Sequence, residues 1–273
     1  MGAASFAAAQ LFRALPRVQL SRMVGMLCDQ PLPPYLSRAI EWAFVRSYRV
    51  DLDEAEPRHS AYPSFDALFT RPLRAGARRV DDVPIVSPAD GQVRAAGSLS
   101  GTGAISVKGN DYGIGELIGD PETADRLSAG SFSVIYLSPR DYHRVHSPVD
   151  GRVVRVQAIA GDLFPVNSIG ERIPRLFVRN SRVVIHIETQ ALGTVLVVMV
   201  GALIVGRISV CAIPSERVPR GTHQLSSPVS VRKGDEIGTF HLGSTVVVLL
   251  EDEHPLVRAE QRVQYGQSLL RAS

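Results

Sequence analysis

The chain contains 273 residues, of which 45% are hydrophobic and 21% charged, and these ordinary globular proportions exclude disordered, collagen-like and coiled-coil proteins. Its two cysteines, Cys28 and Cys211, are too few for a disulfide scaffold or a cysteine-based zinc cluster. The net charge is only +3, whereas residues 1–50 contain six arginines and two acidic residues. Because this basic excess is confined to the N-terminus and lies beside apolar residues, the charge pattern does not indicate a nucleic-acid-binding face.

The sequence of the N-terminal region, residues 1–56, predicts amphipathic helices. An alanine-rich start over residues 3–9 favours helix, and arginines such as Arg13 and Arg17 then alternate with apolar side chains. No charge-free run reaches the ~18–20 residues that are needed to span a bilayer. We therefore expect this segment to lie in the membrane interface with its arginines at anionic headgroups. A helix that packs on the core and exposes its arginine face to solvent would have the same sequence pattern.

From about residue 80 the sequence changes to short runs rich in valine and isoleucine, separated by glycine and proline. This is typical of strands at short spacing. The expected strands are 131–137, 153–159, 182–188, 194–205, 208–213 and 244–250. The sequence therefore predicts an α+β protein: N-terminal amphipathic helices over 1–56, then a domain over 57–273 that is a mostly antiparallel, barrel-like or sandwich-like β structure.

One segment of the β-rich domain is repeated. Residues 87–93 and 147–153 are identical at five of seven positions, and each contains Ser-Pro-x-Asp-Gly ahead of an expected strand. Asp-Gly supplies the backbone freedom that a tight turn needs. The repeat predicts a duplicated β unit.

Three segments contain the side chains best suited to chemistry. They are the turn with Asp90, the polar segment with His143 and His146, and the Gly243-Ser244 pair ahead of the last long strand. The two histidines suggest a metal site, but no third ligand follows them, so general acid–base chemistry is favoured and no metal is expected. An aspartate, a histidine and a serine can act as orienting carboxylate, base and nucleophile. Each segment alone is also compatible with an ordinary turn.

These segments resemble the hallmark motifs of the phosphatidylserine decarboxylase family. The matching motifs are Ser-Pro-Ala-Asp-Gly at 87–91, Tyr-Leu-Ser-Pro-Arg-Asp-Tyr-His-Arg-Val-His at 136–146 and Leu-Gly-Ser-Thr at 242–245, with weaker matches at 65–73, 108–112, 163–167, 176–180 and 200–206. The resemblance extends in collinear order over about residues 30–250. It implies an enzyme that converts phosphatidylserine to phosphatidylethanolamine and CO2, bound peripherally to the cytoplasmic face of the bacterial inner membrane.

The resemblance also implies a covalent pyruvoyl cofactor made from the chain itself, in place of pyridoxal phosphate. Ser244 would attack the Gly243 carbonyl, where a glycine leaves room, and β-elimination from the resulting ester would separate chains 1–243 and 244–273. The pyruvoyl group at position 244 would form a Schiff base with the substrate amine and act as the electron sink for decarboxylation. The two chains would remain together as a heterodimer, and a dimer of these heterodimers is compatible with the family.

The motif match assigns roles to four residues. Asp90, His146 and Ser244 would form the self-cleavage triad, with His146 as base and Asp90 as the carboxylate that orients it. His143 would serve decarboxylation, as proton donor to the carbanion or as partner of the substrate carboxylate. Spacing alone leaves the two histidine roles exchangeable.

Contacts with the lipid are expected at apolar and basic positions. Leu163 and Phe164 form an apolar pair that would contact acyl chains or membrane, and Arg13 and Arg17 would contact headgroups. Pro165 departs from the family motif at a position where a small polar residue is expected, so the sequence assigns no residue to the substrate headgroup.

Three other functions remain open at this stage. A serine hydrolase with the same triad is disfavoured because the sequence has no Gly-x-Ser-x-Gly motif and Ser244 starts a strand with no helix after it. A non-catalytic, membrane-attached β scaffold predicts that the chain is never cleaved. A decarboxylase of a related serine lipid would use the same headgroup chemistry.

Overall fold

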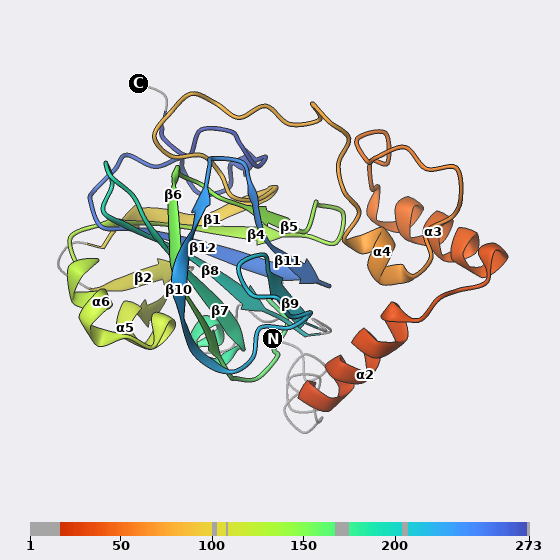
Figure 1. The fold of residues 1–273 in the computed structure, drawn as a ribbon, viewed down its shortest axis with the longest axis horizontal. Coiled ribbons are helices and arrows are strands. Elements are labelled where there is room, and N and C mark those ends of the chain that lie inside the picture. The colour runs from red at the N-terminus through yellow and green to blue at the C-terminus, as the bar shows by residue number, and fades with distance from the viewer. Residues whose placement is uncertain (1–16, 100–102, 108, 167–174, 204–206, 272–273) are drawn as a thin grey trace.

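The computed structural model describes residues 17–99, 103–107, 109–166, 175–203 and 207–271 (Figure 1). The helices are α2 (Arg17–Asp29), α3 (Pro34–Tyr48), α4 (Phe65–Phe69), α5 (Ile114–Ile118), α6 (Pro121–Arg126) and α7 (Leu176–Arg179). The strands are β1 (Gly91–Ser98), β2 (Ala104–Val107), β3 (Asn110–Gly113), β4 (Ser131–Leu137), β5 (Arg144–His146), β6 (Gly151–Ile159), β7 (Arg182–Glu188), β8 (Thr194–Gly201), β9 (Arg207–Val210), β10 (Gly221–Val231), β11 (Glu236–His241), β12 (Ser244–Leu250) and β13 (Arg262–Val263). Among the described helices, none has the length and apolar character to cross a membrane.

The β strands form one large sheet and two small ones. The large sheet has the order β10-β6-β7-β8-β12-β4-β1-β13, and the small sheets are β5-β11-β9 and β2-β3. Every neighbouring pair of these strands is antiparallel, which confirms the predicted class of N-terminal helices followed by a mostly antiparallel body. Within the described residues the large sheet is open, with β10 and β13 at its ends.

The centre of the large sheet is formed by β8 and β12. Every residue of both strands is buried, so their sequences are continuous apolar runs rather than alternating ones. The sequence predicted a buried strand over 194–205, and the structure confirms this up to Gly201; residues 204–206 lie outside the described part. The predicted strands 131–137, 182–188 and 244–250 coincide with β4, β7 and β12.

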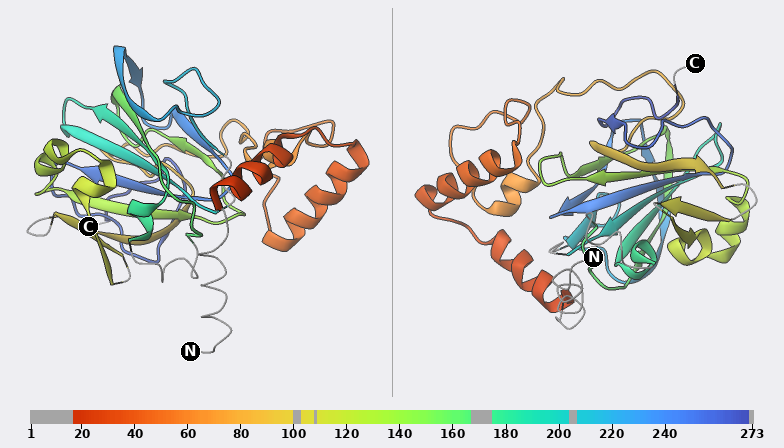
Figure 2. Two further views of the ribbon diagram at one scale, coloured as in Figure 1. Left: turned by 90° about the horizontal axis from the view of Figure 1, so that it is seen from below. Right: turned by 180° about the vertical axis from the view of Figure 1, so that it is seen from behind.

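The N-terminal helices lie together beside the β body (Figures 1 and 2). Helix α4 packs against both α2 and α3, and the Phe44 ring of α3 meets Phe65 of α4 edge-on at 5.1 Å. Several large apolar side chains of α2 and α3 nevertheless remain exposed, among them Met26, Leu27 and Trp42. Such a cluster on one side of a protein marks an interaction surface rather than ordinary exterior.

The repeated Ser-Pro-x-Asp-Gly segments are paired with each other in space. The Val86 amide donates to the Pro148 carbonyl at 2.9 Å, and the His146 amide donates to the Pro88 carbonyl at 2.8 Å. The reciprocal bonds join the two turns around a local twofold arrangement, as a duplicated unit predicts. They also hold the Asp90 turn beside the backbone of His146.

Glycine is required in each repeat for the same structural reason. A Cβ on Gly91 would lie 2.5 Å from the Tyr136 carbonyl oxygen, and a Cβ on Gly151 would lie 2.5 Å from that of Glu188. A contact this short requires the neighbouring strand to move. The glycine of each Asp-Gly pair therefore allows the turn to join directly onto a sheet strand.

Candidate active site

The predicted site residues converge at one end of the large sheet. Leu137, the last residue of β4, is registered with Ser244, the first residue of β12. The loop that follows β4 carries His143, and the Phe240 amide of β11 donates to the His143 carbonyl at 3.0 Å. The histidine loop and the chain that enters β12 therefore meet at the same end of neighbouring strands.

The link between β11 and β12 has an unusual backbone. Leu242 has φ of 80° and Gly243 has φ of 42°, so two consecutive residues adopt positive φ directly before Ser244. For leucine this conformation costs about 1–2 kcal/mol. A Cβ on Gly243 would meet no atom within 4 Å. The backbone conformation, rather than crowding around its α-carbon, is therefore what favours glycine at this position.

Two buried polar atoms near this link have no hydrogen-bond partner. They are Oγ of Ser244, whose residue is 1% exposed, and Nε2 of His143, whose residue is fully buried. His143 Nδ1–H donates to the Asp141 carbonyl at 2.8 Å, and its ring packs on that of Phe69 with the ring centroids 4.0 Å apart. Burial lowers the pKa of His143 to about 3, so the ring is neutral and Nε2 is an unused acceptor. Unpaired buried polar atoms are costly, and they point to a functional requirement.

His146 is held more firmly. Its ring stacks on Tyr265 with centroids 3.8 Å apart, Nδ1–H donates to the Gly234 carbonyl at 2.7 Å, and Nε2 lies 3.3 Å from the Tyr142 hydroxyl. Burial lowers the pKa of His146, while the Gly234 carbonyl and nearby carboxylates, including Asp90, act in the opposite direction. His146 is therefore a neutral histidine with a defined tautomer.

Asp90 is anchored by a partner that the sequence analysis missed. Its carboxylate accepts from Arg78 at 2.6 Å and from the Tyr265 amide at 2.8 Å, and the same guanidinium binds Glu54 at 2.7 Å. Burial lowers the pKa of Arg78, but the hydrogen bonds to Glu54 and Asp90 outweigh it and raise the net pKa. No local pattern identifies Arg78, because its partners lie 12 and 24 residues away.

The four predicted residues thus lie in one region, but their side chains are not joined to one another by hydrogen bonds. The paired turns hold Asp90 beside the His146 backbone, yet no hydrogen bond connects its carboxylate to the His146 ring in the described part of the chain. Neither histidine is hydrogen-bonded to Ser244. Catalytic hydrogen bonds are often long or misaligned before the reacting state forms, so this arrangement remains compatible with a triad.

The predicted lipid contacts have different outcomes. Phe164 is 1% exposed, because the Asn180 side chain binds both its amide and its carbonyl at 2.9 Å and holds it in the core. This corrects the expectation that Phe164 contacts lipid. Leu163 lines a surface cavity. Arg17 is the first residue of α2, and Arg13 lies outside the described residues.

A second polar cluster connects the helices to the reaction centre. The carboxylate of Asp66 in α4 lies 2.9 Å from Nδ1 of His241, whose Nε2 lies 3.2 Å from Ser209 Oγ. Arg207 binds Asp66 at 3.4 Å and also pairs with Asp29 of α2. No sequence spacing reveals this cluster, because Asp66 lies 141 residues from Arg207 and 175 residues from His241. Among the described residues, no group of three or more His, Cys, Asp and Glu could hold a metal ion.

Comparisons with known proteins find one family. The family model described as phosphatidylserine decarboxylase matches residues 65–271. A phosphatidylserine decarboxylase proenzyme of Marinobacter nauticus is 39% identical over 268 residues, which cover 93% of each chain. The proenzyme of Acinetobacter baumannii is 41% identical over 247 residues, with 88% of this chain and 85% of the relative covered. That of Myxococcus xanthus is 39% identical over 248 residues, with coverages of 89% and 88%.

Proposed function

The chain belongs to the phosphatidylserine decarboxylase family, and from this premise we propose that it is a proenzyme that cleaves itself and then decarboxylates phosphatidylserine to phosphatidylethanolamine. One observation carries the proposal to particular atoms. The family motif Leu-Gly-Ser-Thr falls on a left-handed turn followed by a buried serine whose hydroxyl has no partner. A serine without a hydrogen bond at a strained peptide bond is suited to attack that bond.

Self-cleavage requires three steps. Ser244 Oγ loses its proton and attacks the Gly243 carbonyl carbon, and the peptide C–N bond then breaks to give an ester and a free amine on residue 244. Loss of the Ser244 α-proton expels Gly243 as a carboxylate and leaves a dehydroalanine. One water molecule replaces its nitrogen, which departs as ammonia, so residue 244 becomes a pyruvoyl group at the head of chain 244–273.

His146 and Asp90 are proposed to serve the first of these steps. Burial lowers the pKa of His146, so its ring is neutral at neutral pH and able to accept the Ser244 proton. The charge of Asp90 acts to raise the pKa of His146 and would stabilise the imidazolium that forms. To reach Ser244, Nε2 of His146 has to exchange its 3.3 Å contact with the Tyr142 hydroxyl.

His143 is proposed to serve the decarboxylation. The pyruvoyl group supplies an electron sink for the carbanion, and the surroundings of position 244 fit it because they are buried and contain an unused acceptor, Nε2 of His143. A substrate carboxylate that approached this ring would raise the pKa of His143, so that binding and protonation would be coupled. The protonated ring could then hold the carboxylate or return a proton to the product.

We further propose that the protein is peripheral on the cytoplasmic face of an anionic membrane. The exposed Met26, Leu27 and Trp42 support apolar contact, and arginines of the same helices support attraction to headgroups. The cleaved chains would remain associated, because β12 lies between β4 and β8 in the sheet.

The test separates cleavage from decarboxylation. Purified His146→Ala and Asp90→Asn are expected to remain largely uncleaved, whereas His143→Ala is expected to cleave but to release CO2 from phosphatidylserine about 10²–10⁴-fold more slowly. Leu163→Ala serves as a site-proximal control for cleavage. Loss of cleavage in His143→Ala with normal cleavage in His146→Ala would exchange the two roles. A wild-type chain that never cleaves, or that hydrolyses esters instead, would support the scaffold or hydrolase alternatives.

A further inference from the structure

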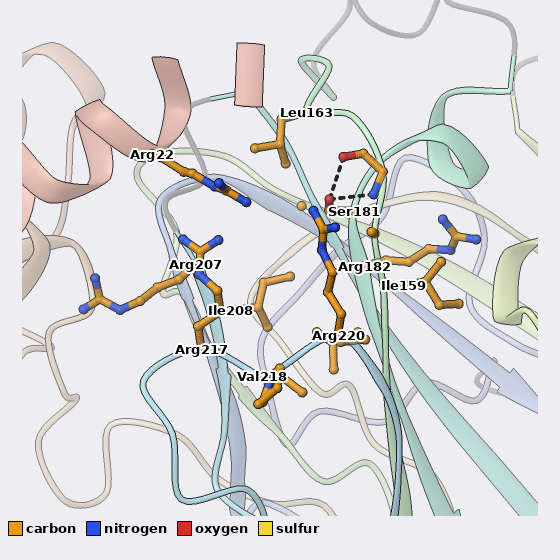
Figure 3. A pocket seen from close by; sticks show the side chains of 16 residues that line it. Arg22, Ile159, Leu163, Ser181, Arg182, Arg207, Ile208, Arg217, Val218 and Arg220 are labelled. Atoms are coloured by element: carbon orange, nitrogen blue, oxygen red, sulfur yellow. Dashed lines mark hydrogen bonds between the residues drawn. The ribbon is translucent and has the colours of Figure 1, made fainter. Parts of the chain in front are cut away.

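A cavity of about 170 Å³ opens between helix α2 and the ends of strands β6, β8 and β9. Figure 3 shows that Arg22 enters it from α2, while Arg220 reaches toward Ser181 from the segment that precedes β10. Apolar side chains, including Leu163 and Ile208, complete the walls. The cavity therefore combines cationic groups with a partly apolar lining.

The cavity has an excess of positive charge. Five arginines line it and no acidic residue does; the arginines are Arg22, Arg182, Arg207, Arg217 and Arg220. Arg182 is occupied elsewhere, since its guanidinium donates to the carbonyls of Leu117, Val178 and Glu116 at 2.5–2.7 Å. Arg207 is paired with Asp29 and Asp66, so its charge is also engaged by other groups of the protein.

Arg22 and Arg220 are placed to hold an anion. No carboxylate of the described residues pairs with Arg22 or Arg220. Burial lowers the pKa of Arg217, and the positive charges of Arg22 and Arg207 lower it further. Arg22, Arg217 and the other cavity cations therefore repel one another. A bound anion would relieve this repulsion, and a phosphate oxygen pair matches the planar guanidinium donors.

The cavity lies one strand away from the reaction centre, at Gly201. This residue lines the cavity and is registered with Ser244 across β8 and β12. Registered residues of antiparallel strands project to the same face with α-carbons about 4.5–5.5 Å apart. Asn180 fixes this wall by donating to the Gly201 carbonyl at 2.9 Å.

We propose that Arg22 and Arg220 bind the phosphate of the serine phosphodiester while the serine amine reacts at position 244. In such a substrate only one methylene and one ester oxygen lie between the α-carbon and phosphorus, so neighbouring subsites are required. This inference rests on the proposed function and assigns its headgroup subsite. Arg22 shares helix α2 with the exposed Met26 and Leu27, so the helix that would contact the membrane also completes the phosphate site.

The test uses dihexanoyl-phosphatidylserine as a water-soluble substrate, so that attraction to a membrane surface does not contribute. Arg22→Gln, Arg220→Gln and the double variant are compared with Arg258→Gln, an exposed arginine outside the cavity. Self-cleavage and pyruvoyl content are measured first and are expected to equal those of wild type. Each single variant is expected to raise KM about tenfold and the double variant more, with Arg258→Gln unchanged, as loss of a charge-assisted hydrogen bond predicts.

The outcomes distinguish this inference from the proposed function. Wild-type protein that cleaves but does not decarboxylate the soluble lipid would refute the function, whatever the arginines do. An unchanged KM for the soluble substrate, with weaker activity only on anionic vesicles, would overturn the phosphate site and assign the arginines to surface attraction. If a variant fails to cleave, calorimetry of dihexanoyl-phosphatidylserine binding to the matching Ser244→Ala precursors decides: lost binding supports the site, and retained binding overturns it.

Discussion

Arg78 is expected to be the most consequential residue outside the family motifs. Its guanidinium is 3% exposed and binds two carboxylates of different exposure, Asp90 at 7% and Glu54 at 33%. Arg78→Gln leaves Asp90 buried without its cation, which costs about 3–5 kcal/mol for a buried pair. Glu54→Gln removes the more exposed partner and leaves Arg78 bound to Asp90, so solvent screening limits its cost to about 1 kcal/mol.

The two variants are compared in the uncleaved Ser244→Ala background, so that both states are single chains. For a domain of this size about 1 kcal/mol corresponds to 2–4 °C in Tm. Calorimetry is therefore expected to give a decrease of about 6–20 °C for Arg78→Gln and about 2–4 °C for Glu54→Gln. With Ser244 restored, Arg78→Gln is also expected to slow self-cleavage, because Asp90 loses the contact that fixes it beside His146. Equal Tm decreases for the two variants, or normal cleavage in Arg78→Gln, would refute this reasoning.

Three further predictions follow from the same structure. Burial lowers the folded-state pKa of His143 to about 3, so below the ordinary pKa of about 6.5 the unfolded chain binds a proton that the folded chain does not. The Tm of the Ser244→Ala precursor should therefore fall as pH decreases from 6.5, and His143→Phe should weaken this dependence. An identical pH profile in the two proteins would contradict the prediction. Leu27→Glu should reduce flotation with phosphatidylglycerol vesicles by about tenfold or more without changing Tm, since Leu27 is 67% exposed; undiminished flotation would remove α2 from the membrane contact. Asp66→Asn should release His241 beside the Leu242–Gly243 turn and so slow self-cleavage more than Ser209→Ala does. The rate at which the small chain appears measures this. Equal cleavage rates in the two variants would limit the cluster to a structural role.

Three buried strands were predictable to the residue because their signal is local. The apolar runs at 131–137, 182–188 and 244–250 predicted both ends of β4, β7 and β12 without error, since each strand is buried over most of its length. The internal repeat likewise predicted a paired unit, because the same turn chemistry is used twice.

The features that were missed depend on contacts across the chain. Arg78 has no motif of its own and is recognised only when folding brings it to Asp90. Phe164 was misassigned because an apolar pair in a loop has the same sequence signature whether it faces lipid or core; the side chain of Asn180, 16 residues away, decides between them. The arginine cavity combines α2 with five separate segments of the β-rich part of the chain, and no sequence spacing reveals such a set.

The most direct test of the whole account is the intact mass of the purified protein under denaturing conditions. The account predicts two chains, 1–243 and 244–273, with the small chain lighter than its unmodified sequence by the difference between an N-terminal serine and a pyruvoyl group, which is one ammonia. Ser244→Ala should give a single chain. A single unmodified wild-type chain of 29.6 kDa that persists on incubation with phosphatidylserine vesicles, or a break at any other peptide bond, would contradict it.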